Sequence, residues 1–193
     1  MGDISGKSHA GLVERLQGRP LVFVGLMGAG KTAIGRRVAT ELGVAFVDSD
    51  HEIESVARMT IPELFERYGE PEFRALEQRV IGRLLTGGTR VLATGGGAYM
   101  NDETRRGIAE HAVSIWLKAD LDTLMGRVGR KQNRPLLKTE NPRETMEKLM
   151  AVRYPVYANA DITVLTRDDR REVIAGEVIA AVDEHLAERE RVA

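Results

Sequence analysis

The segment GLMGAGKT at residues 25–32 constrains the fold of this chain more than any other feature. It matches the pattern G-x-x-x-x-G-K-[S/T]. It lies between an apolar run at 21–24, typical of a buried strand, and a helical pattern of apolar residues over 31–42. In this setting the N–H groups of the loop and the positive end of the helix surround a phosphate. The sequence therefore predicts a nucleoside triphosphate site. Its expected contacts are Gly28, Ala29, Gly30, Lys31, Thr32 and Ala33.

Short apolar strands alternate with helices along the rest of the chain. Strands are predicted at 21–24, 44–47, 91–93, 112–117 and 162–165, and helices at 31–42, 51–58, 70–85, 101–111, 120–128, 142–154 and 171–191. A further helix begins at the capping box of residues 60–63. Such alternation favours an α/β fold, a parallel sheet with helices on both faces, and ligands bind outside the carboxyl ends of its strands. We expect one domain over 20–193, preceded by a flexible segment over 1–19 in which residues 12–16 could form a helical turn.

Composition excludes several classes of protein. The chain has 193 residues, no cysteine and a formal net charge of -1. It cannot use a disulfide scaffold, a thiol nucleophile or a cysteine zinc site, and it has no general attraction for nucleic acid. No apolar run reaches the roughly 18 residues of a spanning helix, and residues 1–19 lack a secretory pattern. We expect a cytoplasmic protein with neither nucleic-acid nor membrane partners.

Two carboxylates follow the second predicted strand. Asp48 and Asp50 lie two positions apart, so in extended chain they point to the same side. The third strand ends in Thr94 and Gly95 with no acid, which leaves Asp48, with Thr32, as the expected ligand pair for Mg²⁺. Asp50 would then face an acceptor hydroxyl. The alternative for both aspartates is a helix cap.

A basic segment without acids covers residues 126–138, with Gly126 and Gly129 as hinges. A solvated loop and a nucleic-acid patch are its alternatives, but the segment has no stacking aromatics. With a nucleotide site in the same chain, a mobile lid that closes over the phosphates is the better interpretation. The glycine-rich loop alone also allows a GTPase switch or a motor. However, the Asn-Lys-x-Asp pattern of GTPases is absent, and the chain is too short for the added domains of a motor.

The ordered set of motifs resembles the shikimate kinase family, of the nucleoside-monophosphate-kinase-like P-loop fold. The set comprises GLMGAGKT at 25–32, DSD at 48–50, FERYGEPEFR at 65–74, GGG at 95–97 and RPLL at 134–137, over nearly the whole chain. The resemblance implies a three-layer fold with five strands in the order 2-3-1-4-5. It also implies phosphoryl transfer from ATP, with Mg²⁺, to the 3-hydroxyl of shikimate.

The same resemblance assigns roles to individual residues. Arg74 and Arg153 would grip the carboxylate of shikimate, within a substrate-binding region of about 48–80. Asp50 would contact the ring hydroxyls, and Gly95, Gly96 and Gly97 would line the pocket. Arg134 in the lid would meet ATP, as would Arg127, and either Arg170 or its neighbour Arg171 would flank the adenine. The expected catalytic residues are Lys31, Asp50 and Arg134.

Two alternatives remain open on sequence grounds. A kinase for another polyol acid, such as gluconate, would share the glycine-rich loop but would not need the arginine of 65–74 together with Arg153. A nucleotide switch would hydrolyse ATP without any small acceptor. Whichever function applies, we expect the protein to be a monomer.

Overall fold

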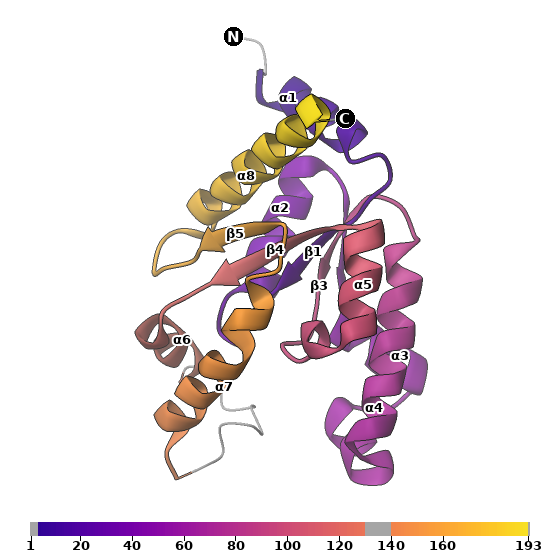
Figure 1. Cartoon of the computed structure of the whole chain (residues 1–193), viewed down its shortest axis with the longest axis vertical. Coiled ribbons are helices and arrows are strands. Elements are labelled where there is room, and N and C mark those ends of the chain that lie inside the picture. Colours follow the sequence, from indigo (N-terminus) through magenta and orange to yellow (C-terminus); the bar gives the residue numbers. More distant parts are fainter. Residues whose placement is uncertain (1–3, 130–139, 193) are drawn as a thin grey trace.

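The computed structural model describes residues 4–129 and 140–192. Its centre is a five-stranded parallel sheet in the order β2-β3-β1-β4-β5 (Figure 1). The strands are β1 (Leu21–Val24), β2 (Ala45–Asp48), β3 (Arg90–Ala93), β4 (Val113–Lys118) and β5 (Ile162–Leu165). The expected α/β fold and strand order are confirmed, and each predicted strand agrees with the structure to within one residue.

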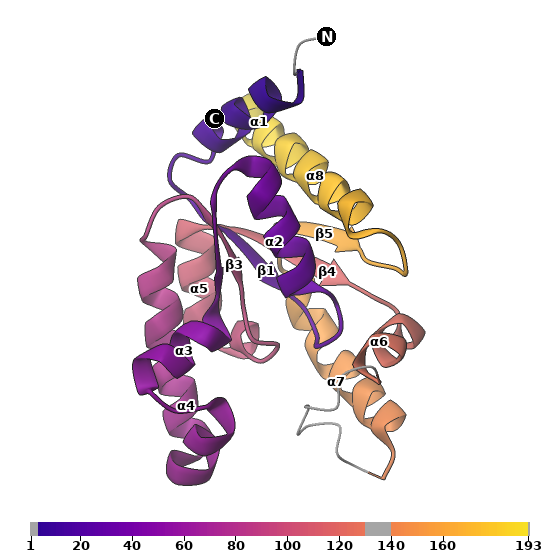
Figure 2. The same cartoon turned by 180° about the vertical axis from the view of Figure 1, so that it is seen from behind.

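Helices form the two outer layers. On one face α2 (Lys31–Leu42) and α8 (Arg171–Val192) pack against the sheet and against each other (Figure 2). On the other face lie α5 (Asp102–His111) and α7 (Pro142–Tyr157), with the short 3-10 helix η1 (Ala98–Met100) beside them (Figure 1). The remaining helices are α1 (Ile4–Arg15), α3 (Ser49–Ala57), α4 (Ile61–Leu85) and α6 (Leu121–Val128). In the described part of the chain, no helix combines the length and apolar character needed to span a bilayer.

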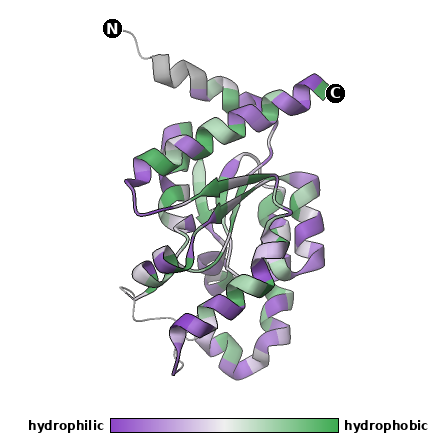
Figure 3. Ribbon diagram, turned by 60° about the vertical axis from the view of Figure 1, so that its left-hand side comes forward, coloured by the Kyte–Doolittle hydropathy of each residue, from purple (hydrophilic) through white to green (hydrophobic). Residues whose placement is uncertain are grey.

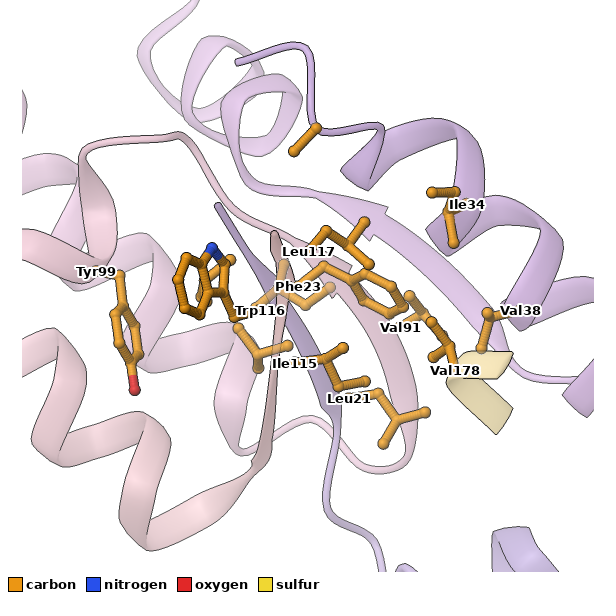
Figure 4. Packing of buried hydrophobic residues seen from close by; sticks show 14 of the residues in the cluster. Leu21, Phe23, Ile34, Val38, Val91, Tyr99, Ile115, Trp116, Leu117 and Val178 are labelled. Carbon is orange, nitrogen blue, oxygen red and sulfur yellow. The ribbon is translucent and has the colours of Figure 1, made fainter. Parts of the chain in front are cut away.

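The core lies on both faces of the central strands. All four residues of β1 are buried, as are Val91 and Leu92 of β3 and the first five residues of β4. Figure 4 shows Ile34 and Val38 of α2 on one side of the sheet and Tyr99 of η1 on the other. Figure 3 shows the same arrangement by hydropathy, with apolar strands surrounded by helices that carry hydrophilic residues. This apolar centre fixes the strand ends where the functional motifs begin.

Residues 1–19 differ from the flexible segment expected from the sequence. Residues 4–15 form α1, while residues 1–3 lie outside the described part of the chain. Leu12 and Leu16 are 3% and 0% exposed within the core, and Arg15 forms ion pairs with Asp183 (2.5 Å) and Glu190 (2.8 Å) of α8. Burial of two leucines offsets the entropy cost of ordering this segment, whose own sequence is a weak helix former.

Three helices depart from their predicted bounds. α3 begins at Ser49 rather than at residue 51, so Asp50 lies in its first turn and not in the extended chain that was expected. α7 was expected to end near residue 154, before Pro155, but it continues to Tyr157. The proline removes only its own N–H, and the helix bond from Ala158 N to Tyr154 O (3.0 Å) follows it. In α4, the predicted separate helices meet at Gly69, whose φ of 80° and ψ of 174° produce a kink. The capping box of Thr60 and Glu63 is confirmed at the start of α4.

Candidate active site

The glycine-rich loop joins β1 to α2 at the carboxyl edge of the sheet. Gly28 and Gly30 have φ of 84° and 98°, a left-handed conformation that favours glycine, and they turn the loop over the start of α2. The Lys31 ammonium donates to the carbonyls of Gly25 (2.8 Å) and Leu26 (3.0 Å) and so lies over the loop. The first helix bond runs from Ile34 N to Gly30 O, which leaves the N–H of Ala33 in the anion-binding first turn.

Thr32 and Asp48 bring two oxygens together beside this loop. Thr32 Oγ1 donates to Asp48 Oδ2 at 3.0 Å. The other carboxylate oxygen of Asp48 accepts from the N–H of Asp50 at 3.1 Å and so caps α3. The cap predicted as the alternative for Asp48 is therefore present, and its other oxygen lies against Thr32, the residue expected to share Mg²⁺ with it. A hydroxyl and a carboxylate are oxygen ligands of the kind Mg²⁺ prefers beside phosphates and water.

Arg127 at the end of α6 reaches the glycine-rich loop from the opposite side. Its Nη1 donates to Gly28 O and Ala29 O, both at 3.3 Å, and to Thr166 Oγ1 at 3.1 Å. Its Nη2 donates to the carbonyl of Arg167, in the loop after β5. Removal from water lowers the pKa of Arg127, although an arginine remains charged at neutral pH. The geometry places a fixed cation against the expected phosphate site.

Two further arginines are predicted to contact the nucleotide, and the structure describes one of them. Arg170 is exposed just before α8, in the same loop that receives Arg127. Arg134, with residues 130–138 of the expected lid, lies outside the described residues. Gly126 and Gly129, the expected hinges of that lid, are described: Gly126 lies within α6 and Gly129 directly follows it.

Three charged side chains from three elements meet at the glycines that follow β3. A Cβ built on Gly95 would lie 2.8 Å from Asp50 Oδ1, and one on Gly97 would lie 2.7 Å from both terminal nitrogens of Arg74. A Cβ on Gly96 would lie 3.4 Å from Arg153 Nη1. At Gly95 and Gly97 a side chain would displace the charged group that lies there, whereas a Cβ on Gly96 would make an ordinary contact. The expected convergence of Asp50, Arg74 and Arg153 is present.

Glu77 is a member of this cluster whose pairing with Arg74 is predicted by their spacing of three residues, although the sequence favours an ordinary ion pair at the surface. Its carboxylate accepts from Arg74 Nη1 at 2.7 Å, and its side chain is only 4% exposed. Burial raises the pKa of Glu77, while Arg74 opposes that shift. Glu77 falls on the buried face of α4 with Phe73, Val80 and Ile81, so its apolar neighbours at helical spacing were the available signal.

Tyr157 is a residue of the site that the sequence analysis missed. Its hydroxyl donates to Gly96 O, the same carbonyl that accepts from Arg153 Nη1 at 3.1 Å. The predicted end of α7 at residue 154 left Tyr157 outside the helix that carries Arg153. Its presence in the site follows from the continuation of α7 beyond Pro155.

The glycine-rich loop and the charged cluster lie next to each other at Gly96. A Cβ on Gly96 would lie 3.5 Å from Gly25 O and 3.7 Å from Met27 N. A small molecule held by Arg74, Arg153 and Asp50 would therefore lie beside a triphosphate on the loop. This arrangement suits transfer of a phosphoryl group between two bound reactants.

Comparison with known proteins gives a consistent result. Residues 27–183 match the family model described as shikimate kinase. The chain is 67% identical to the shikimate kinase of Mesorhizobium japonicum over 181 residues, which is 94% of this chain and 89% of that protein. It is 58% identical to the shikimate kinase of Rhizobium meliloti over 189 residues, 96% of this chain and 98% of that protein.

Solved structures resemble the fold over most of its length. The shikimate kinase of Acinetobacter baumannii, in complex with shikimate, matches with a TM-score of 0.84 and 35% identity over 90% of this chain and 97% of that one. A gluconokinase from Sinorhizobium meliloti matches with a TM-score of 0.62 and 15% identity over 93% of this chain and 99% of that one. The second likeness concerns the fold alone.

Proposed function

This chain belongs to the shikimate kinase family, and we propose that it transfers the γ-phosphoryl group of ATP to the 3-hydroxyl of shikimate, giving shikimate 3-phosphate and ADP. One observation carries the assignment of the acceptor site. Asp50, Arg74 and Arg153 come from three separate elements and meet at Gly95–Gly97, next to the glycine-rich loop. Shikimate is a small anion with three hydroxyls. This cluster offers two cations for its carboxylate and one carboxylate that accepts hydrogen bonds from its hydroxyls.

Arg74 and Arg153 bind the carboxylate of shikimate in this proposal. Guanidinium groups form paired, charge-assisted hydrogen bonds with carboxylates, and two of them from different helices fix the orientation of the ring. Arg74 is held by Glu77, and Arg153 is held by Gly96 O, so neither head group needs to be ordered when the substrate binds. Gly95, Gly96 and Gly97 leave room for the ring against the backbone.

ATP occupies the loop of 25–32 and the first turn of α2. The N–H groups of Gly28, Ala29, Gly30, Lys31, Thr32 and Ala33 surround the phosphates, and the Lys31 ammonium moves from the loop carbonyls to the β- and γ-phosphates. Arg127 donates hydrogen bonds to the carbonyls of Gly28 and Ala29 in the loop and contacts the nucleotide. Arg170 flanks the adenine, and Arg134 closes onto the transferring group from the lid, outside the described residues.

Thr32 and Asp48 are the residues that would hold Mg²⁺, Asp48 directly or through a water molecule. Their oxygens lie 3.0 Å apart beside the loop, a donor set that suits a hard cation with phosphate and water as its other ligands. Bound there, the ion neutralises charge on the phosphates of ATP.

The chemistry of the step depends on positioning and charge. Asp50 accepts a hydrogen bond from the reacting hydroxyl, aligns its oxygen with the γ-phosphorus, and receives its proton as the new bond forms. Lys31 and Arg134 stabilise the negative charge spread over the transferring group. Arg74 and Arg153 hold the ring of shikimate in one orientation while the phosphoryl group is transferred.

An assay of ADP release tests this function against its alternatives. We expect rapid ADP release with ATP and shikimate, and little with ATP and gluconate or with ATP alone. Turnover with gluconate equal to that with shikimate would identify a kinase for another polyol acid. ATP hydrolysis that is independent of any acceptor would identify a nucleotide switch.

We also propose that the chain acts in the cytoplasm as a monomer. Size-exclusion chromatography with light scattering checks the second point, and a mass near the 21.3 kDa of one chain is the expected result.

A further inference from the structure

Two hydrogen-bond donors share one backbone carbonyl in the acceptor site. Gly96 O accepts from Arg153 Nη1 at 3.1 Å and from the hydroxyl of Tyr157. Both donors belong to α7, one helical turn apart, and the carbonyl belongs to the loop after β3. A carbonyl oxygen has two lone pairs, so the two donors do not compete.

The ring of Tyr157 is held rigidly in the interior. The side chain is 0% exposed, and its ring centroid lies 6.0 Å from that of Trp116 and 6.3 Å from those of Tyr99 and Tyr154. These aromatic contacts come from β4, η1 and α7 itself. A hydroxyl on such a ring has a fixed position, so the carbonyl that accepts from it is fixed as well.

We propose that Tyr157 is a positioning residue for the acceptor substrate, one that acts by fixing the Gly96 carbonyl and, through it, the guanidinium of Arg153. This inference rests on the proposed function, because it requires Arg153 to bind the carboxylate of shikimate. When one nitrogen of Arg153 is anchored on Gly96, its remaining N–H groups point in a defined direction. The Tyr157 hydroxyl keeps that anchor in place.

The ionisation state of Tyr157 agrees with this role. Burial raises the pKa of Tyr157 to about 12, and Arg153 partly opposes the shift. The hydroxyl therefore keeps its proton throughout the physiological range and remains a donor to the carbonyl.

Tyr154 provides a matched control in the same helix. Its hydroxyl also donates to a backbone carbonyl, that of Ala119, and its ring also contacts Trp116, at a centroid distance of 4.9 Å. Ala119 follows β4, outside the glycines of the acceptor site. Tyr157→Phe and Tyr154→Phe thus remove the same group from the same kind of bond, and only one of those bonds holds the acceptor site.

The experiment measures steady-state kinetics of both variants. Tyr157→Phe is expected to raise the KM for shikimate about threefold to tenfold, with kcat and the KM for ATP changed less than twofold, as for loss of one neutral hydrogen bond. Tyr154→Phe is expected to leave all three within twofold of the parent. A Tyr157→Phe KM for shikimate within twofold of the parent, or an equal rise in both variants, overturns the inference.

Arg153→Lys separates this inference from the proposed function. We expect this variant to raise the KM for shikimate, and its combination with Tyr157→Phe to raise it by less than the product of the single effects. If Arg153→Lys responds and Tyr157→Phe does not, only the role of Tyr157 is wrong. If Arg153→Lys leaves the KM unchanged, the carboxylate site itself is wrong.

A second measurement separates weaker binding of shikimate from a general loss of stability. Tyr157→Phe retains the ring, and Arg153 still satisfies the Gly96 carbonyl, so the variant is expected to fold. The rise in melting temperature on adding shikimate is measured for each variant against its own ligand-free value, which remains valid for a weakened protein. A smaller rise for Tyr157→Phe than for Tyr154→Phe supports the inference, and equal rises overturn it.

Discussion

The carboxylate of Asp50 has the most direct part in the proposed phosphoryl transfer. Asp50→Asn keeps the shape of the side chain but removes the group that accepts the proton, so kcat should fall about 100-fold or more. Affinity for ATP should be unchanged, because Thr32 and Asp48 remain. Turnover and nucleotide binding are measured separately, and near-normal turnover would show that the role assigned to Asp50 is wrong.

Arg74 offers a test of whether a guanidinium, rather than any positive charge, is needed to bind the substrate carboxylate. Its Nη1 is held by Glu77 at 2.7 Å and its Nη2 by Glu70 at 3.2 Å. Arg74→Lys retains the charge but cannot bind a carboxylate through two parallel bonds, so the KM for shikimate should rise about tenfold or more. Arg83→Lys, an exposed substitution on the same helix, is the control. Equal shikimate affinity in the two variants would contradict the clamp.

Glu77 links the acceptor site to the pH dependence of stability. Burial raises its pKa above the 4.5 of an exposed glutamate, and Arg74 limits the shift. The folded state thus binds this proton more tightly than the unfolded state, so its contribution falls as pH rises from about 4.5 through the folded pKa. Glu77→Gln removes that dependence. Its free energy of unfolding relative to the parent should rise over this window, as measured by urea denaturation. A difference constant between pH 4 and 8 would contradict the argument.

Sequence reasoning reached the charged residues of the site more readily than their supports. Asp50, Arg74 and Arg153 have side chains whose chemistry suggests a ligand wherever they occur in a motif. The pairing of Glu77 with Arg74 follows from their spacing, but the burial of Glu77 depends on contacts outside its own helix turn. The role of Tyr157 becomes visible only once the loop after β3 is placed against α7.

The loop after β3 depends on the absence of side chains. A Cβ on Gly97 would lie 2.7 Å from two nitrogens of Arg74, so Gly97→Ala should displace that guanidinium and raise the KM for shikimate, with little change in the KM for ATP. Gly82→Ala in α4 is the control, since nothing lies within 4 Å of its Cβ. It should stabilise the protein by about 0.5–1 kcal/mol and leave kinetics unchanged. Equal kinetics for both variants would show that Gly97 is not needed for space.

Helix α1 shows why one element was predicted only as a single turn. Leu12 within it and Leu16 just after it are buried, and the ion-pair partners of Arg15, Asp183 and Glu190, lie at the other end of the chain. Figures 1 and 2 show α1 beside the end of α8. Local periodicity cannot report contacts between residues so far apart in sequence, whereas the strands and the glycine-rich loop are specified by neighbours within a few positions.

The order of strands explains why the site could be predicted at all. The glycine-rich loop follows β1, Asp48 ends β2 with Asp50 just after it in α3, the glycines follow β3, and these three strands are neighbours in the sheet. Arg127 and the loop of Thr166 lie beyond β4 and β5, on the other side of the loop after β1. The proposed donor and acceptor thus take opposite sides of β1, and a near-neutral chain concentrates its cations where two anions meet.

Binding should stabilise the molecule as a whole. A ligand that binds only the folded state at about 100 times its Kd adds about 2.7 kcal/mol, which for a chain of this size raises the melting temperature by about 5–10 °C. Shikimate should produce such a shift, and gluconate at the same concentration should not. Arg74→Lys should need more shikimate for an equal shift, because the clamp is weaker while the fold is intact. Thermal denaturation with increasing ligand measures all three, and no shift with shikimate would contradict the acceptor site.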